Sequence, residues 1–382
     1  MTAEPVASLD RALGVLRADV RAMQAYQVHP SSGLIKLDAM ENPFRLPAEL
    51  QRALGERLGA VAINRYPGER TQDLAQALAA HAGLGPDKGL MLGNGSDELI
   101  SLLAMAVCRP GERVAVLAPV PGFVMYALSA KYQHLDFVGV PLTADFELDE
   151  AAMLAAIAEH RPAIVFLAYP NNPTANLWDA AVIERIVRAA PGLVVMDEAY
   201  QPFAARDAMA LMARYPQVLI MRTMSKFGLA GVRIGYMMGD ATLIGHIDKL
   251  RPPYNVSVLN AEAGLFALEH AEVYERQAAL LRAERAALQA ALACLPGLHA
   301  YPSEGNMILV RVPDADRLHA DMKARGVLVK NVSGMHPLLA RCLRLTVGSA
   351  EENAAMLAAL EAAMAGSAGS ADIAALAPVP SV

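Results

Sequence analysis

Residues 223–233 of this 382-residue chain read TMSKFGLAGVR, and an apolar run comes directly before them. Two hydroxyl side chains, Thr223 and Ser225, precede Lys226, and Arg233 follows it by seven residues. A lysine amine can form a Schiff base with an aldehyde cofactor. Hydroxyls and a guanidinium can hold the phosphate of such a cofactor. Taken alone, this pattern more often indicates an exposed loop lysine without a cofactor than a lysine that binds one.

Two further segments place polar side chains just after buried strands. Asp197 ends the apolar run 193–196, and Tyr200 follows three residues later. A carboxylate at a strand end can keep a pyridine nitrogen protonated, which makes the ring an electron sink. Asn172 lies in YPNNPT, after the run 163–168, where two prolines can fix its amide beside a ring hydroxyl. A helix cap and an Asn-Pro turn are the ordinary alternatives for these two residues.

The segment GNGSDE, residues 93–98, joins a predicted strand to a predicted helix. Glycine allows close backbone approach, and the free N–H groups of a helix start favour a phosphate. Gly95, Ser96 and Asp97 are therefore candidate phosphate-binding residues. Acids in a first helical turn can equally be there to stabilise the helix dipole.

Strands and helices alternate through the middle of the chain, which predicts an α/β fold with a large, mostly parallel sheet. The predicted strands are 90–92, 113–117, 163–168, 193–196, 218–222 and 234–238, and the predicted helices include 71–81, 97–107, 149–159 and 179–189. From 260 to 294 the pattern predicts one long helix. After it, strands 307–312, 327–329 and 343–347 and helices from Asp314 and Ala350 predict a smaller α+β domain.

These patterns divide the chain into four parts. We expect an N-terminal arm with a helix at 1–34, a large cofactor-binding α/β domain at 35–255 and a small C-terminal α+β domain at 256–365. The segment 366–382, rich in Gly, Ser, Ala and Pro, is expected to be a disordered tail.

Composition excludes several classes of protein. The net charge of -6 argues against nucleic acid as a partner, since phosphate backbones require clustered Lys and Arg. No run is apolar enough for a signal peptide or a membrane span, so no membrane partner is expected. The three cysteines, Cys108, Cys294 and Cys342, are odd in number, far apart and without metal-ligand spacing. We expect reduced thiols, no metal and a cytoplasmic protein.

Together, in this order and each at a predicted strand end, these motifs resemble the fold-type I aminotransferases that depend on pyridoxal 5'-phosphate (PLP). Three more segments resemble the histidinol-phosphate aminotransferase family of the class II subfamily: IKLDAMENPF at 35–44, NRYPG at 64–68 and CLRLTVG at 342–348. The resemblance runs from about Tyr26 to Glu361.

The resemblance implies a role for each site residue. Lys226 would carry the cofactor, Asp197 would pair with the pyridinium nitrogen, Asn172 and Tyr200 would bind the phenolic oxygen, and Phe123 would stack on the ring. The phosphate would be bound by Gly95, Ser96, Thr223, Ser225 and Arg233, and Asp97 would be a further cofactor-binding residue. Tyr66 would reach that phosphate from a neighbouring subunit, which implies a homodimer with shared active sites.

The resemblance also implies the reaction, in which L-histidinol phosphate gives its amino group to 2-oxoglutarate and the products are imidazole-acetol phosphate and L-glutamate, a step of histidine biosynthesis. The implied substrate-binding residues are Tyr26, Asn42, Asn172, Lys330 and Arg344. The fork of Arg344 suits both a phosphate and a carboxylate. Some relatives have an arginine near Lys330, where a lysine offers a less directional charge.

Three other functions stay open at this point. The same scaffold would serve an aminotransferase for aromatic amino acids, or a PLP-dependent decarboxylase of threonine phosphate. A PLP-binding regulator without turnover is the alternative outside enzymes. Such regulators carry a fused DNA-binding domain, and nothing basic or resembling a helix-turn-helix precedes Ile35.

Overall fold

The computed structural model describes residues 9–24 and 30–365. The chain divides into two units, residues 1–33 and 34–382. The first unit contains two short helices, α1 (Leu9–Gly14) and α2 (Ala18–Arg21), and an ion pair of 2.8 Å between Arg17 and Asp19. The tail expected at 366–382 lies outside the described residues. Within the described part, no helix is both long and apolar enough to span a bilayer.

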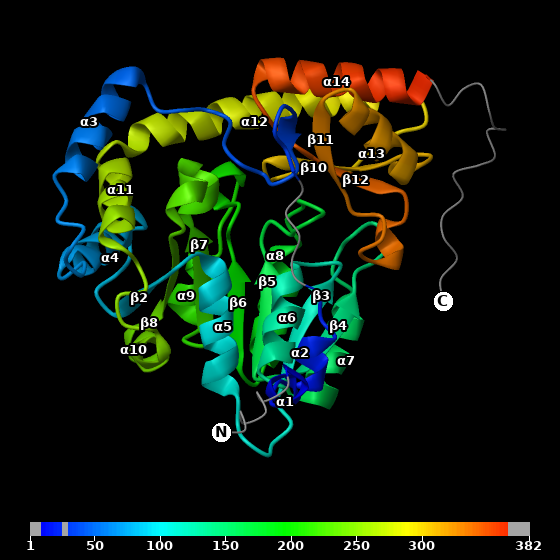
Figure 1. Ribbon diagram of the computed structural model, residues 1–382. Coiled ribbons are helices and arrows are strands. Elements are labelled where there is room, and N and C mark those ends of the chain that lie inside the picture. The colour runs from blue at the N-terminus through cyan, green and yellow to red at the C-terminus, as the bar shows by residue number, and fades with distance from the viewer. Residues whose placement is uncertain (1–8, 25–29, 366–382) are drawn as a thin grey trace, which may run out of the picture. The chain divides into compact units, whose positions relative to one another are not determined.

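A seven-stranded sheet forms the centre of the second unit (Figure 1). Its strands are β2 (Lys88–Gly93), β3 (Ala115–Val120), β4 (Asp136–Pro141), β5 (Ile164–Ala168), β6 (Leu193–Asp197), β7 (Val218–Thr223) and β8 (Gly235–Asp240). Their order is β2-β8-β7-β6-β5-β3-β4, and only β8 runs antiparallel to its neighbours. The expected α/β class with a mostly parallel sheet is confirmed, and β4 is an additional edge strand.

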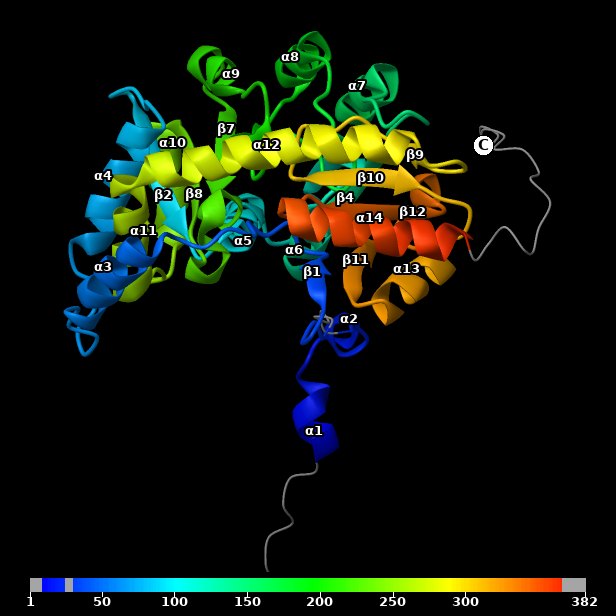
Figure 2. The ribbon, with the colours of Figure 1, turned by 90° about the horizontal axis from the view of Figure 1, so that it is seen from above.

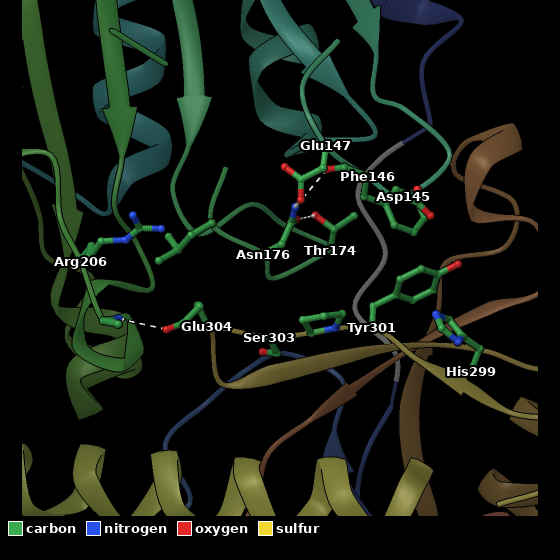
Figure 3. Close-up of a pocket in the computed structure, with 13 residues that line it drawn as sticks. Asp145, Phe146, Glu147, Thr174, Asn176, Arg206, His299, Tyr301, Ser303 and Glu304 are labelled. Carbon is green, nitrogen blue, oxygen red and sulfur yellow. Dashed lines mark hydrogen bonds between the residues drawn. The ribbon is translucent and has the colours of Figure 1, made fainter. Parts of the chain in front are cut away.

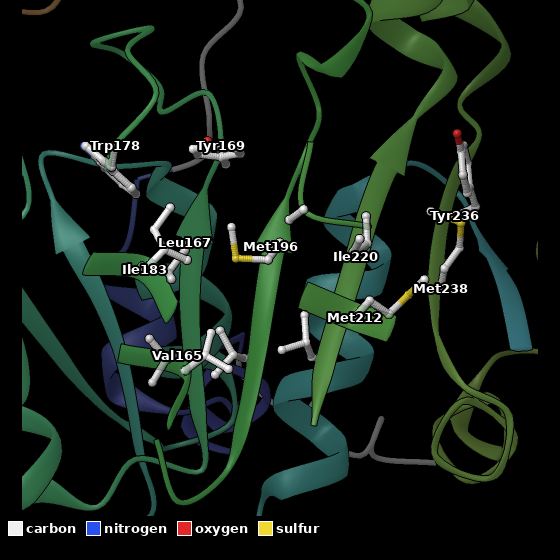
Figure 4. Close-up of a cluster of buried hydrophobic side chains, with 14 of the residues drawn as sticks. Val165, Leu167, Tyr169, Trp178, Ile183, Met196, Met212, Ile220, Tyr236 and Met238 are labelled. Atoms are coloured by element: carbon white, nitrogen blue, oxygen red, sulfur yellow. The ribbon is translucent and has the colours of Figure 1, made fainter. Parts of the chain in front are cut away.

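Helices cover both faces of this sheet because its strands are apolar on both sides. On β5, Val165 and Leu167 join one core cluster while Ile164 and Phe166 join the other. The first cluster, part of which Figure 4 shows, is closed by α4 (Arg70–His81), α7 (Glu150–His160), α8 (Ala180–Ala189), α9 (Met209–Arg214) and α11 (Val258–Glu269). The second is closed by α5 (Ser96–Val107), α6 (Val124–Tyr132) and α10 (Ala241–Ile247).

A second sheet of five strands has the order β1-β11-β12-β10-β9. Its strands are β1 (Ile35–Leu37), β9 (His299–Ala300), β10 (Met307–Arg311), β11 (Val327–Asn331) and β12 (Cys342–Thr346), and it packs with α12 (Ala271–Ala293), α13 (Ala315–Ala324) and α14 (Ala350–Ala365). β1 pairs in parallel with β11. The chain segment at 35–37, which we expected to belong to the large domain, thus supplies a strand to the smaller sheet.

The single long helix expected at 260–294 is wrong, since α11 ends at Glu269 and α12 begins at Ala271. His270 between them has φ -121° and ψ 32°, which is not helical. No Gly or Pro marks the break. α12 connects the two cores, because Tyr274 packs in the core of the larger sheet and Leu288 in that of the smaller one (Figure 2).

The remaining elements are short or peripheral. They are α3 (Ala48–Gly59) and the turns η1 (Gln201–Phe203), η2 (Ser225–Leu229), η3 (Ala230–Val232), η4 (Asp248–Leu250) and η5 (Pro337–Leu339). The parallel strands β3, β5, β6 and β7 all end at the same edge of the larger sheet. β2 also ends there, because it runs antiparallel to β8, which itself runs antiparallel to β7. Segments that follow these strands meet there.

Candidate active site

A cavity of about 150 Å³ lies at this carboxyl edge. It is lined by most of the side chains that the sequence motifs singled out: Ser96, Asp97, Phe123, Asn172, Asp197, Tyr200, Thr223, Ser225, Lys226 and Arg233. They follow five different strands, so the sheet, and not one local motif, brings them together. Met40, Tyr126, Ala168, Pro170 and Ala199 complete the lining.

Lys226 lies in η2, directly after β7, and its Nζ donates a hydrogen bond of 2.8 Å to the carbonyl oxygen of Ala39. Nζ is also 5.9 Å from the centre of the Tyr200 ring. Burial, and next the positive charge of Arg344, lower the pKa of Lys226 to about 8. A substantial fraction of the amine is therefore neutral, and thus nucleophilic, at mildly alkaline pH.

Asp197 is the last residue of β6 and accepts two hydrogen bonds. The backbone N–H of Ala199 donates to Oδ1 at 3.1 Å, and the hydroxyl of Tyr126 donates to Oδ2 at 2.6 Å. Burial raises the pKa of Asp197 to about 6, and the two hydrogen bonds oppose that rise. At pH 7 and above the carboxylate is mostly ionised and can pair with a cationic ring nitrogen.

The opposite part of the cavity suits an anion. α5 begins at Ser96, so its first N–H groups have no partner within the helix. Arg233 donates a hydrogen bond of 3.2 Å to Ser225 Oγ, and its Nη2 lies 3.6 Å from Asp97 Oδ2. Gly95 has φ +78°, which L side chains rarely adopt, and a Cβ there would lie 2.5 Å from Arg233 Nη2, so a larger residue would be strained and would displace this guanidinium.

The residues around the cavity can be compared with the groups that PLP needs for binding. The cofactor needs an amine for its aldehyde, a carboxylate for its ring nitrogen and donors for its phosphate. Lys226, Asp197 and the group of α5, Ser225 and Arg233 supply these three requirements around one cavity. The donor set therefore fits.

Arg344 on β12 lies next to this cavity, although it belongs to the smaller sheet. Its Nη1 donates to Asn172 Oδ1 at 2.7 Å, and its Nη2 donates to the carbonyl oxygen of Asp38 at 2.7 Å. The side chain is buried. These contacts hold a guanidinium fork beside the residues that line the cavity.

Three other sequence-predicted site residues are not among the described residues that line this cavity. Tyr66 is 76% exposed and stacks on Tyr254, with ring centres 4.3 Å apart. Asn42 Nδ2 donates to Gln277 Oε1 at 2.9 Å and lies 3.5 Å from the carbonyl oxygen of Phe227, the residue after Lys226. Lys330 pairs with Arg344 in the register of β11 and β12 and does not line the cavity. Tyr26 lies outside the described residues.

Tyr126 is a lining residue with a titratable side chain to which the sequence motifs assigned no role. Phe123 immediately precedes α6 and Tyr126 lies in its first turn. Residues three apart on a helix face the same side, so the spacing from Phe123 was the available signal.

A larger cavity of about 460 Å³ lies between other loops of the two sheets (Figure 3). Thr174 and Asn176 reach it from the loop that carries Asn172, and Tyr301 and Glu304 face it from the side of the smaller sheet. Among the described residues, no lysine lines this cavity, whereas Lys226 lines the smaller one.

The fold and the smaller cavity define an aminotransferase of class I and II, and the family model described as aminotransferase class I and II matches residues 32–360. The chain is 67% identical to histidinol-phosphate aminotransferase of Methylibium petroleiphilum, over 91% of this chain and 94% of that protein. It is 64% identical to the protein of the same name from Paracidovorax citrulli, over 94% and 99%. The chain thus belongs to the family of histidinol-phosphate aminotransferases.

Among solved structures, the crystal structure of histidinol-phosphate aminotransferase from Sinorhizobium meliloti in complex with pyridoxal-5'-phosphate is similar, with a TM-score of 0.80 and 25% identity. The match covers 92% of this chain and 98% of that one.

Proposed function

We propose that this aminotransferase binds PLP at Lys226 and transfers the amino group of L-histidinol phosphate to 2-oxoglutarate. The products are imidazole-acetol phosphate and L-glutamate, and the step belongs to histidine biosynthesis. One observation carries the proposal: Lys226, Asp197 and an anion-binding helix start surround one cavity, and Arg344 lies beside it. The names of the most similar relatives support the choice of substrate.

When bound, PLP supplies a protonated ring that accepts electron density from the substrate's α-carbon. The residues of this chain move the proton and hold the cofactor. Lys226, whose amine has a lowered pKa, would take the proton from that carbon and deliver it to the aldehyde carbon of the cofactor. Asp197 holds the ring nitrogen in its protonated form. Asn172 and Tyr200 bind the phenolic oxygen, and Phe123 packs on the ring.

Cofactor binding by the cofactor-free protein is expected to depend on pH through Lys226. Only the neutral amine attacks an aldehyde, so the rate of reconstitution with PLP should rise with pH, with a midpoint near 8. An ordinary lysine would give a midpoint near 10.5. Stopped-flow absorbance over pH 6–11 measures this rate, and a midpoint above 10 would contradict the assignment of Lys226.

Arg344 is the proposed anchor for both substrates. Histidinol phosphate has a phosphate ester where 2-oxoglutarate has a carboxylate, and a guanidinium fork binds either anion through paired N–H donors. The contacts with Asn172 and Asp38 fix the fork before substrate arrives. Less ordering entropy is then lost on binding.

Replacing Arg344 with alanine is expected to raise KM for both substrates about tenfold to a hundredfold, as the loss of a charged hydrogen-bonding group would. The cofactor should stay bound, because Arg344 does not line its cavity. Steady-state kinetics with each substrate, together with the visible absorbance of the bound cofactor, test both statements. Arg341→Ala, at an exposed arginine three residues earlier, is the control. Unchanged KM values for both substrates would refute the role.

We also propose a homodimer in which Tyr66 reaches the phosphate site of the partner. Ile63, Tyr66, Leu250 and Tyr254 are exposed large hydrophobic side chains, and Tyr66 stacks on Tyr254. Exposed apolar side chains that gather on a surface favour association. Sedimentation equilibrium should give twice the chain mass of 40.6 kDa. A monomer with full activity would contradict the shared site.

The proposed location is the cytoplasm, in keeping with the three free cysteines.

The decisive experiment is a half-reaction with the protein reconstituted with PLP. Adding L-histidinol phosphate should abolish the visible absorption band of the bound cofactor, and 2-oxoglutarate should restore it. If histidinol phosphate leaves the band unchanged but phenylalanine or tyrosine abolishes it, the amino donor is an aromatic amino acid and not histidinol phosphate. Release of carbon dioxide from threonine phosphate would indicate a decarboxylase. Absence of any band would overturn the proposal.

A further inference from the structure

A buried hydrogen bond connects α6 to the end of β6, and the reaction described above does not use it. The hydroxyl of Tyr126 lies 2.6 Å from Oδ2 of Asp197. Tyr126 is 2% exposed and Asp197 is 5% exposed, so water does not compete strongly for this contact. Both residues line the cavity that contains Lys226.

Packing fixes the orientation of the Tyr126 ring. It stacks on Phe166 of β5, with ring centres 4.4 Å apart and planes 5° apart. Phe123 packs against it edge to face, with centres 5.7 Å apart. Because the ring is held on both sides, its hydroxyl has little freedom except to point at Asp197.

The proton of this contact belongs to the phenol. Burial, and next the charge of Asp197, raise the pKa of Tyr126 well above its ordinary value of 10. The pKa of Asp197 is about 6, so at neutral pH the hydroxyl donates and the ionised carboxylate accepts. A hydrogen bond to the charged form of a carboxylate stabilises that form. The Ala199 N–H adds a second donor on the other oxygen.

We propose that Tyr126 is a positioning residue of the reaction, whose hydroxyl orients the Asp197 carboxylate and keeps it anionic for the ring nitrogen of the cofactor. This inference rests on the proposed binding of PLP. It assigns Tyr126 no contact with the substrate, because it acts through Asp197. The other charged or titratable groups that line this cavity among the described residues are Asp97 of α5, Tyr200 on the loop after β6, Lys226 of η2 and Arg233 before β8.

Tyr126→Phe tests the proposal because it keeps both ring contacts and removes only the hydroxyl. The dissociation constant of PLP, measured by titrating the cofactor-free protein, should rise about tenfold at pH 7, as expected for a lost hydrogen bond to a charged group. In a plot of PLP affinity against pH, the affinity falls at low pH as Asp197 becomes protonated, and this acid limb should move to higher pH in the variant. In the reconstituted enzyme kcat should fall about tenfold, with KM for histidinol phosphate within about twofold.

Tyr132→Phe is the matched control, since it removes a hydroxyl from an exposed residue of the same helix that does not line the cavity. It should change none of these quantities. An unchanged dissociation constant and acid limb in Tyr126→Phe would overturn the inference. The half-reaction of the unaltered protein tests PLP chemistry separately, so the two failures are distinguishable.

A double-mutant cycle separates positioning from packing. In an Asp197→Asn background the hydroxyl no longer faces a carboxylate, so adding Tyr126→Phe should change PLP affinity by less than about twofold. An equal loss of affinity in both backgrounds would show that the hydroxyl acts only through packing, and would refute the role. The cycle needs no activity measurement, since cofactor affinity is read directly.

Discussion

Replacing Lys226 with alanine is expected to lower transamination about ten-thousand-fold, because one side chain supplies both the amine for the cofactor and the base for the α-carbon. The fold should survive. Lys226 makes one side-chain hydrogen bond, to the Ala39 carbonyl, and alanine is compatible with the turn that follows β7. Without this amine PLP can associate only non-covalently, so its dissociation constant should rise and its visible band should change.

Single-turnover kinetics with histidinol phosphate measure the loss. Added ethylamine should restore part of the rate, since a free amine can enter the space left by the side chain and serve as the base. Lys249→Ala, which removes an exposed lysine of η4, is the control and should keep full activity. A Lys226→Ala protein with activity within tenfold of the unaltered protein would refute the central assignment.

Most of the cofactor cavity could be predicted from sequence because its residues follow strands of one sheet. The end of a parallel strand is visible as an apolar run that stops at a polar residue, as it does at Asp197 and before Lys226. Parallel strands then force these ends to the same edge. Arg344 lies on a different sheet, so the strand ends of the larger sheet did not predict its contact with Asn172; its fork and the resemblance indicated it as a substrate-binding residue.

The features of the fold and of the site that could not be predicted depend on contacts between residues far apart in the sequence. Asn42 belongs to a family-like motif, yet Gln277, 235 residues away on α12, binds its amide. The strand β4 contains Asp136, Gly139 and Pro141 and lies at an edge, where burial imposes no regular pattern. The break at His270 has no Gly or Pro signal. Such features are set by packing between elements, which local periodicity does not record.

A second large effect is expected from Arg222→Met, this time on stability. Arg222 of β7 is 8% exposed and Glu198, which follows β6, is 1% exposed. The guanidinium Nε and Nη2 both lie 2.8 Å from Glu198 Oε2, and the Ala208 N–H donates to the other oxygen. Methionine would keep the apolar stem but remove the cation beside Glu198, whose pKa burial already raises to about 7, so the buried carboxyl must carry an unpaired charge or take up a proton. The free energy of unfolding should fall by about 3–5 kcal/mol.

Urea unfolding followed by fluorescence of Trp178, the single tryptophan, measures this loss at equal protein concentrations. Arg185→Met breaks a more exposed ion pair, with Glu150, and should cost no more than about 1 kcal/mol. Adding Glu198→Leu to Arg222→Met should recover much of the loss, since the unpaired charge is then gone. Equal costs for the two single arginine variants would refute the argument. The pair directly adjoins Asp197 and Thr223, so its loss should also weaken PLP binding, by loosening the two strand ends that carry them.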